Sequence, residues 1–358
     1  MPKASVSKTI KAPRTVKPSR KKAEAAMADQ TVQQAAPDFI GDFIGNPTAA
    51  AFFSRSLGLG RLAHAYLLVG PEHVGKTELA RRVAASLLGS DKPETHPDFL
   101  LVERTPDPKT GKPRDNIAIA QVHELRGAIA KSALRGGRKV AVIVGAEFLG
   151  REAANALLKT LEEPSGDAVL ILTTTSAEDM MATVRSRCQL VRLARVSRGA
   201  LANALVARGV PAPLAATAAA LADGRPGRAL TLAQDPAALA ELVATRAAIL
   251  AMPGLAIADK WQAVERLIPP RLPFIEAGER AGIFLDLAAE ILRDALLVQA
   301  GLTNRLVHAD AKDQVTAFSA RLGTRRLERA ALAVATARQR LAANVSPRAA
   351  LENFLLRI

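Results

Sequence analysis

The residues with the clearest chemical potential form a glycine-rich run, GPEHVGKT, at 70–77. This run fits the pattern G-x-x-x-x-G-K-[ST], in which backbone N–H groups at the start of a helix bind phosphate oxygens. In that pattern Lys76 reaches the β- and γ-phosphates, and the Thr77 hydroxyl ligates magnesium. We therefore expect Gly70, Gly75, Lys76 and Thr77 to form a nucleotide-binding site for ATP with Mg²⁺.

The elements around this loop are those that phosphate binding requires. An apolar run at 65–69 predicts a strand before the loop, and helical periodicity predicts a helix at 76–88 after it. These flanks favour a nucleotide site over a glycine-rich surface turn. The same patterns predict further strands at 99–102, 139–144 and 168–173, and helices at 119–134 and at 151–163, where Pro164 ends the helix. Strands that alternate with helices indicate a parallel sheet and an α/β fold.

Hydrolysis would need acidic residues at the end of a buried strand, to hold magnesium and to orient water. The strand at 139–144 ends instead with Val144 and Gly145, where such an acidic pair is expected. Glu147 is the nearest carboxylate, and its position favours a solvent-facing or helix-capping role, although a shifted loop would bring it toward the metal. The sequence therefore leaves an ATPase activity of this chain in doubt.

The composition changes after the strand-like run CQLV at 188–191, where the chain becomes rich in Ala, Leu and Arg. Strand patterns stop there, and helical patterns follow one another between Gly and Pro breaks. In the last part, one helical face carries Phe284, Leu287, Ile291, Ala295 and Val298, which predicts a core face. We predict a basic arm at 1–38, a P-loop domain at 39–191, a helical lid at 192–237 and a second helical domain at 238–358.

Charge and composition exclude several other classes of protein. The net charge is +15, and residues 1–22 hold eight basic side chains and no acid, which predicts a disordered arm that solubilises the chain or contacts nucleic acid. Aromatic residues make up only 3%, which argues against a dedicated nucleic-acid-binding module. The single Cys188 excludes an internal disulfide, and the absence of a long apolar run argues against a membrane span, so we expect a cytoplasmic protein.

Several motifs together resemble the bacterial DNA polymerase III clamp-loader family of AAA+ proteins, and within it the delta-prime subunits. One motif, GRLAHAY at 60–66, precedes the P-loop, and another, AANALLKTLEEP at 153–164, follows it. The others are TVRSRC at 183–188 and NVSPR at 344–348, which is followed by Leu351 and Glu352. The resemblance covers about residues 40–358 and implies an AAA+ P-loop domain with a parallel sheet, a small helical lid and an all-helical collar that assembles a ring.

The resemblance also implies roles for individual residues. Arg187 matches the arginine of the Ser-Arg-Cys motif, which acts in trans on ATP held by a neighbouring subunit; a structural salt bridge is the alternative. Thr174 stands at the family's sensor-1 position, and Arg228 lies near the sensor-2 arginine, displaced by one residue. The cysteine zinc module of the family is absent between Leu88 and Asp98, so no zinc is expected.

The implied function is that of a clamp-loader subunit with little or no ATP hydrolysis of its own. Such a subunit would assist ATP-dependent loading of the sliding clamp onto primed DNA during replication. The implied partners are the ATPase subunits and delta in a hetero-oligomeric ring, the sliding clamp and primer-template DNA. The alternative is a catalytically active clamp-loader ATPase subunit or a related AAA+ ATPase.

Overall fold

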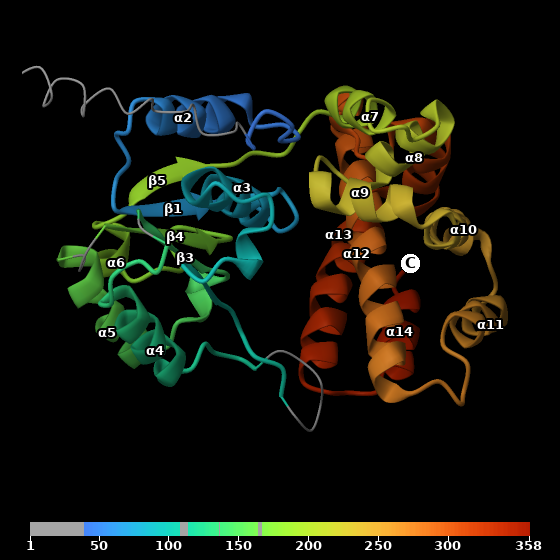
Figure 1. The fold of residues 1–358 in the computed structure, drawn as a ribbon. Helices are drawn as coiled ribbons and strands as arrows, with labels where there is room; N and C mark the ends of the chain where they lie inside the picture. The colour runs from blue at the N-terminus through green and yellow to red at the C-terminus, as the bar shows by residue number, and fades with distance from the viewer. Residues whose placement is uncertain (1–38, 108–113, 136, 164–166) are drawn as a thin grey trace, which may run out of the picture.

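The structure is a computed structural model that describes residues 39–107, 114–135, 137–163 and 167–358 (Figure 1). The predicted basic arm and Pro164 lie outside the described residues. Figure 1 shows an α/β part that contains the sheet and, beside it, a part built only of helices. The boundaries predicted for the arm, P-loop domain, lid and collar stay predictions.

A parallel sheet organises the first half of the chain. Its strands in the described residues are β1 (Ala65–Val69), β2 (Phe99–Val102), β3 (Lys139–Ile143), β4 (Ala168–Thr174) and β5 (Gln189–Arg192). They lie in the order β2-β3-β4-β1-β5, and every neighbouring pair is parallel. Every residue of β1, β3 and β4 is buried, which explains their uninterrupted apolar sequences. The predicted parallel α/β fold is confirmed.

Helices cover both faces of this sheet (Figure 1). One face packs against α2 (Pro47–Gly58) and α3 (Lys76–Leu88), and the other against α4 (Ile119–Ile129), α5 (Arg151–Glu162) and α6 (Ala182–Arg185). Successive strand residues alternate between the two cores: Tyr66 and Leu68 face the first group, whereas Leu67 faces the second. The sheet is therefore held between two apolar layers.

The helix predicted at 119–134 ends earlier than expected, at Ile129. A carboxylate 36 residues away in the sequence binds the backbone at the end of the predicted helix. The carboxylate of Asp98 accepts the N–H groups of Leu134 (2.8 Å) and Arg135 (3.1 Å), which holds this segment in a turn before β3. The apolar character of Leu134, which is 76% exposed, therefore misled the periodicity argument.

The second half of the chain is helical throughout the described residues. Its first helices are α7 (Arg198–Val206), α8 (Ala212–Leu221) and α9 (Pro226–Gln234). They are followed by α10 (Pro236–Ala251), α11 (Ile257–Leu267), α12 (Phe274–Gln299), α13 (Lys312–Ala342) and α14 (Pro347–Leu355). One continuous apolar core joins α7 and α8 to α12 and α13, and the face predicted on α12 is buried except for a partly exposed Val298.

One helical segment, Pro236–Gly254, is long and apolar enough to cross a membrane by length and composition. Core helices of water-soluble proteins pass the same test, so this property is weak evidence for a span. In this chain Leu239, Leu242 and Ile249 of the segment pack into the helical core. The buried Arg246 forms an ion pair with Asp310 at 2.7 Å, which is typical of a helix packed within protein.

Candidate functional site

The predicted phosphate loop connects the end of β1 to the start of α3. Gly75 precedes α3 with a φ of 101°, which favours glycine, and a Cβ there would lie 3.1 Å from the ring of Phe43. A Cβ on Gly70 would lie 2.3 Å from the backbone oxygen of Leu193. The fold therefore brings Gly70, Gly75, Lys76 and Thr77 together at a helix N-terminus, as the sequence predicts, and both glycines are sterically required.

Lys76 is held inside this loop by its own backbone. Its ammonium Nζ donates to the carbonyl oxygens of Gly70 (2.6 Å) and Pro71 (2.8 Å). Burial lowers the pKa of Lys76, while the nearby carboxylates of Glu147 and Glu72 act in the opposite direction. Since an ammonium group has three donors, one remains for a phosphate oxygen. The lysine is thus positioned by the loop before any nucleotide binds.

Of the two positions at which hydrolysis would need acids, the structure accounts for the glycine and not for the valine. The N–H of Val144 donates to the oxygen of Val102 at 2.8 Å, which extends the pairing of β3 with β2. Gly145 has a φ of 71°, and a Cβ there would come within 2.8 Å of the Phe148 ring. A glutamate at position 145 would therefore strain the backbone and collide with this ring.

Glu147 is folded back toward the phosphate loop, so the expectation that it faces solvent or caps a helix is wrong. It lies in the short helix η2 (Ala146–Phe148), and its Oε1 accepts from the N–H (3.1 Å) and the hydroxyl (3.0 Å) of Thr175. Its Oε2 is buried and has no hydrogen-bond partner among the described residues. Its charge acts on Lys76. The left-handed Gly145 turns the chain so that this carboxylate returns to the end of β4.

Thr174 contacts the phosphate loop through its backbone rather than its hydroxyl. Its carbonyl oxygen accepts from the N–H of Gly70 at 3.2 Å. The hydroxyl is fully buried and donates to the carbonyl of Ser176 at 2.8 Å. The exposed hydroxyl at this strand end belongs to Thr175, which binds Glu147. The structure therefore places Thr174 beside the loop with its donor already used.

Arg228 lines a cavity together with Glu72 and His73 of the phosphate loop, but its hydrogen bond goes to α12. Its guanidinium donates to Oε1 of Glu290 at 2.9 Å, and burial raises the pKa of this glutamate although the arginine opposes the shift. The neighbouring residue Gly227 makes the contact with the loop, since its N–H donates to the oxygen of His73 at 3.0 Å. Helix α9 therefore contacts the phosphate loop through Gly227 and α12 through Arg228.

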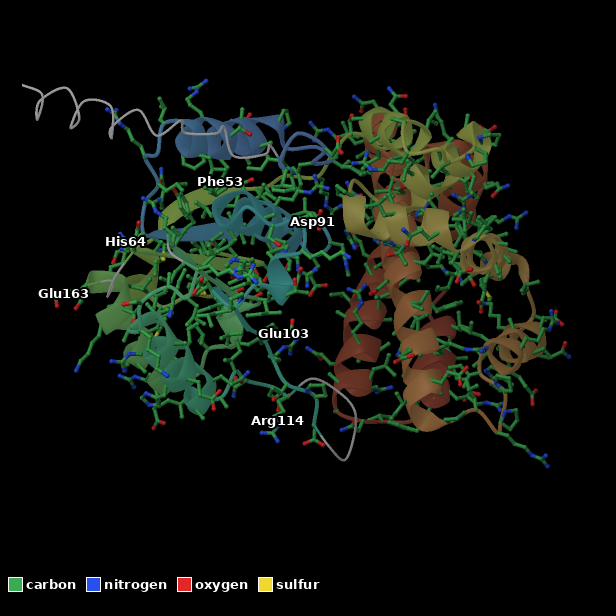
Figure 2. The ribbon with its side chains drawn as sticks, in the orientation of Figure 1. Phe53, His64, Asp91, Glu103, Arg114 and Glu163 are labelled. Atoms are coloured by element: carbon green, nitrogen blue, oxygen red, sulfur yellow. The ribbon has the colours of Figure 1, made fainter. Side chains whose placement is uncertain are left out.

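Arg187 lies at the opposite edge of the sheet. It stands two residues before β5, whose first residue Gln189 pairs with Tyr66 near the start of β1. Because a strand rises about 3.3 Å per residue, Arg187 lies roughly 20 Å from the loop that follows β1. Figure 2 shows His64, just before β1, and Glu163 at this outer edge. The side chain of Arg187 cannot reach its own phosphate loop.

The contacts of Arg187 are few and exposed. Its guanidinium pairs with Oε1 of Glu162 at 2.5 Å and donates to the carbonyl of Thr183 at 2.9 Å. The two paired side chains are 34% and 48% exposed. Ion pairs with this exposure contribute about 0–1 kcal/mol to stability, so Glu162 positions Arg187 without locking it. Burial raises the pKa of the neighbouring Cys188 to about 12, which keeps its thiol protonated.

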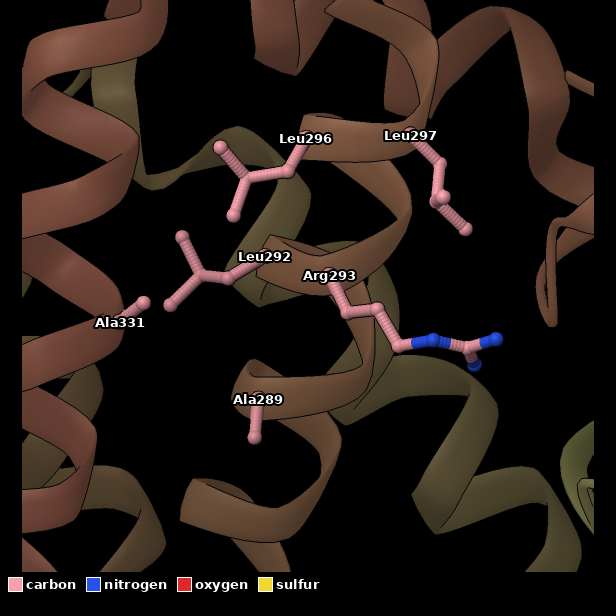
Figure 3. Close-up of a pocket in the computed structure, with 6 residues that line it drawn as sticks. All are labelled: Ala289, Leu292, Arg293, Leu296, Leu297 and Ala331. Carbon is pink, nitrogen blue, oxygen red and sulfur yellow. The ribbon is translucent and has the colours of Figure 1, made fainter. Parts of the chain in front are cut away.

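A cavity of about 430 Å³ adjoins the phosphate loop, and its charged lining includes Glu72, Arg225 and Arg228. An apolar pocket of about 300 Å³ between α12 and α13 is lined by Ala289, Leu292, Arg293, Leu296, Leu297 and Ala331. The guanidinium of Arg293 extends to the side opposite Leu292 and Leu296 (Figure 3). In the part of the chain that the structure describes, no group of three His, Cys, Asp or Glu side chains could hold a metal ion. The chemistry is therefore concentrated at the two edges of the sheet.

Family models and curated relatives match much of this chain. The family "DNA polymerase III, delta subunit" matches residues 45–197, and its C-terminal counterpart matches residues 272–358. The chain is 26% identical to DNA polymerase III subunit delta' of Bacillus subtilis over 325 residues, which are 87% of this chain and 95% of that protein. It is 40% identical to the Pseudomonas aeruginosa subunit delta' over 159 residues, 40% of this chain and less than half (46%) of that relative.

Two solved bacterial structures are among those similar to this chain. A DNA polymerase III gamma subunit-related protein from Thermotoga maritima has a TM-score of 0.47 at 18% identity, over 85% of this chain and 97% of that chain. The DNA clamp loader delta protein of Bacillus subtilis has a TM-score of 0.39 at 12% identity, over 86% and 98%. On the evidence of the family matches and the curated relatives, this chain belongs to the DNA polymerase III delta-prime family of clamp-loader subunits.

Proposed function

We propose that this chain works as a delta-prime-type subunit of a cytoplasmic DNA polymerase III clamp loader. In this role it joins ATPase subunits and a delta subunit in a hetero-oligomeric ring. The ring opens the sliding clamp and releases it onto primed DNA. Family membership supports the assignment, and so does the sequence similarity to DNA polymerase III subunits gamma and tau of other bacteria.

The contribution of this chain to catalysis is Arg187, supplied to ATP on the neighbouring subunit. The position of Arg187 carries the proposal: it lies roughly 20 Å from its own phosphate loop and at an exposed edge. A guanidinium has a fixed charge and a planar fork that suits phosphate oxygens. Its exposed pair with Glu162 is weak enough to be exchanged for a γ-phosphate when the neighbour docks.

The phosphate loop of this chain would bind ATP with Mg²⁺ and turn it over slowly or not at all. Lys76 and the backbone N–H groups that begin α3 suit the phosphates, and the Thr77 hydroxyl suits the metal. Bound magnesium would neutralise phosphate charge. Val144 and Gly145 add no carboxylate to hold the metal or orient water, so the loop is better suited to binding than to hydrolysis.

The test is an Arg187→Ala chain in the assembled loader, with Arg192→Ala as the control because Arg192 is an exposed arginine at the other end of β5. An arginine finger contributes about 10³-fold or more at the site it completes. We expect Arg187→Ala to leave ring assembly intact and to lower the DNA-stimulated ATPase sharply, while Arg192→Ala changes neither. Unchanged ATPase with Arg187→Ala would overturn the proposed role.

Glu147 supports a second candidate, an active ATPase. Its buried Oε2 lacks a partner among the described residues, and its charge acts on Lys76, so it could replace a missing acid. The experiment is steady-state ATP hydrolysis by the isolated chain with primed DNA. Turnover that both Lys76→Ala and Glu147→Gln abolish would establish the second candidate. Turnover no higher than that of Lys76→Ala would exclude it.

A further inference from the structure

The C-terminal helices α13 and α14 form a basic groove that the proposed ATP-site roles do not use. The groove encloses about 260 Å³. One face of α13 lines it with Arg329, Leu332, Ala333, Thr336, Ala337 and Arg340. Helix α14 and the residues after it line it with Ala350, Asn353, Phe354 and Arg357. The floor is apolar or small, and arginines flank it.

The charge of the groove is not balanced within the described residues. Helix α13 carries seven basic and two acidic side chains. Of its arginines, Arg338 is paired with Asp286, whereas no carboxylate lies at ion-pair distance from Arg329 or Arg340 in the part of the chain that the structure describes. Arg357 is likewise without an ion pair there. A partner with negative charge would therefore find three free guanidinium groups along one groove.

The floor of the groove determines which anionic partner fits best. Leu332 is 71% exposed, and the half-buried Ala333 beside it is small enough to let a third helix approach closely. Single-stranded nucleic acid would need an exposed aromatic platform, but the aromatic residue of the groove, Phe354, is only 1% exposed. An amphipathic helix with leucines on one face and carboxylates beside them satisfies both the apolar floor and the arginines.

We propose that the α13–α14 groove is a docking site for an acidic amphipathic helix of a partner protein. The apolar face of the helix would cover Leu332 and Ala333, and its carboxylates would pair with Arg329, Arg340 and Arg357. The basic N-terminal segment of this chain carries the wrong charge for this role. The inference goes beyond the proposed function, since it requires neither the phosphate loop nor Arg187.

Fluorescence anisotropy with the full chain tests the proposal. The probe is a labelled helical peptide of about 18 residues with leucine at i, i+3 and i+4 spacing and glutamate beside it, compared with a scrambled peptide of the same composition. The double variant Arg329→Glu/Arg340→Glu removes the groove charge. Arg325→Glu/Arg326→Glu is the matched control, because it makes the same charge change on exposed residues of α13 that do not line the groove.

We expect the amphipathic peptide to bind at least about fivefold more tightly than the scrambled one, and the groove variant to weaken it about tenfold or more. Leu332→Glu should also weaken binding, whereas the control variant should stay within about twofold of the native chain. Equal losses in the groove and control variants would reduce the effect to general charge and overturn the proposal. The proposal would also be overturned, in favour of nucleic acid, if a single-stranded oligonucleotide bound more tightly than the amphipathic peptide and the groove variant abolished that binding.

Discussion

The two edges of the central sheet carry the two candidate sites, and they are built in opposite ways. At the carboxyl edge the phosphate loop is held by several hydrogen bonds: Lys76 donates to backbone carbonyls, and the N–H of Gly227 donates to His73 from α9. At the amino edge Arg187 stands on an exposed turn with one weak ion pair. The carboxyl edge has Val144 and Gly145 where the acids are expected and only Glu147 near Lys76, whereas the amino edge presents an arginine that its own phosphate loop cannot use.

This difference indicates which edge of the sheet can contact another subunit. A group that must contact another subunit has to be accessible and lightly held, and Arg187 meets both conditions. The phosphate loop is constrained by close packing around Gly70 and Gly75 and by the contact with α9. The carboxyl edge is therefore a structural centre that can hold a nucleotide, and the amino edge is the one that can act on a neighbour.

The largest effect should come from Gly70→Ala, which tests how closely the carboxyl edge is packed. The added Cβ would meet the backbone oxygen of Leu193 at 2.3 Å, and backbone cannot move aside as a side chain can. We expect a loss of about 3 kcal/mol in the free energy of unfolding, measured by chemical denaturation. Gly127→Ala is the control, because nothing lies within 4 Å and alanine there should stabilise α4 by up to about 1 kcal/mol. A neutral Gly70→Ala would show that the loop is loosely packed.

The next effect is a pH dependence of the helical part behind the carboxyl edge. His308 is fully buried, and burial lowers its pKa from 6.5 to about 4. Between these values the unfolded chain binds a proton that the folded chain does not, so stability rises with pH in this window. Acidification from pH 7 to pH 5 should therefore cost about 2 kcal/mol through this group.

Two carboxylates near His308 oppose this slope. Oε2 of Glu290 lies 3.8 Å from Nε2 of the histidine, and Asp294 accepts its backbone N–H. Burial raises the pKa of both acids, so their protonation favours the folded state as the pH falls. The contribution of the histidine is therefore the difference in slope between the native chain and His308→Leu, measured by denaturation at several pH values. Identical slopes would show that His308 does not titrate in this way.

The smallest effect is expected at the amino edge. Glu162→Gln removes the partner of Arg187, but both side chains are well exposed. The free energy of unfolding should change by less than about 1 kcal/mol in thermal or chemical denaturation. The assembled loader should keep its ATPase activity, since Arg187 remains. A loss of several kcal/mol in the free energy of unfolding would mean that the Arg187–Glu162 pair stabilises the fold. The two edges would then no longer differ in how firmly their residues are held.

Local patterns in the sequence predicted the main elements of the α/β part. The strand at 65–69 was expected because continuous apolar runs are typical of strands buried on both faces, and all its residues are buried. The apolar run at 99–102 also forms a strand, although it lies at the end of the sheet and Leu101 is exposed. The one-turn helix α6 (Ala182–Arg185) was not expected, because one turn carries no periodicity. The strand order of the sheet also depends on packing between distant segments, which local patterns do not encode.

The candidate site was predictable only where its residues are close in sequence. The loop at 70–77 could be identified because a single turn contains all its groups. The partner of Arg228, Glu290, is 62 residues away, and no local signal indicates that pairing. The return of Glu147 to Thr175 depends on the left-handed backbone of Gly145, which the sequence suggests only through the presence of glycine.

Single-turnover ATP hydrolysis by the assembled loader tests whether Arg187 acts on the ATP of a neighbouring subunit. The loader is reconstituted with this chain as native, Arg187→Ala or Lys76→Ala, and the size of the rapid, DNA-stimulated phase is compared. We expect Arg187→Ala to remove the share of one ATP site from this phase and Lys76→Ala to leave the phase unchanged. If Lys76→Ala reduced the rapid phase and Arg187→Ala did not, the proposed role of Arg187 would be wrong.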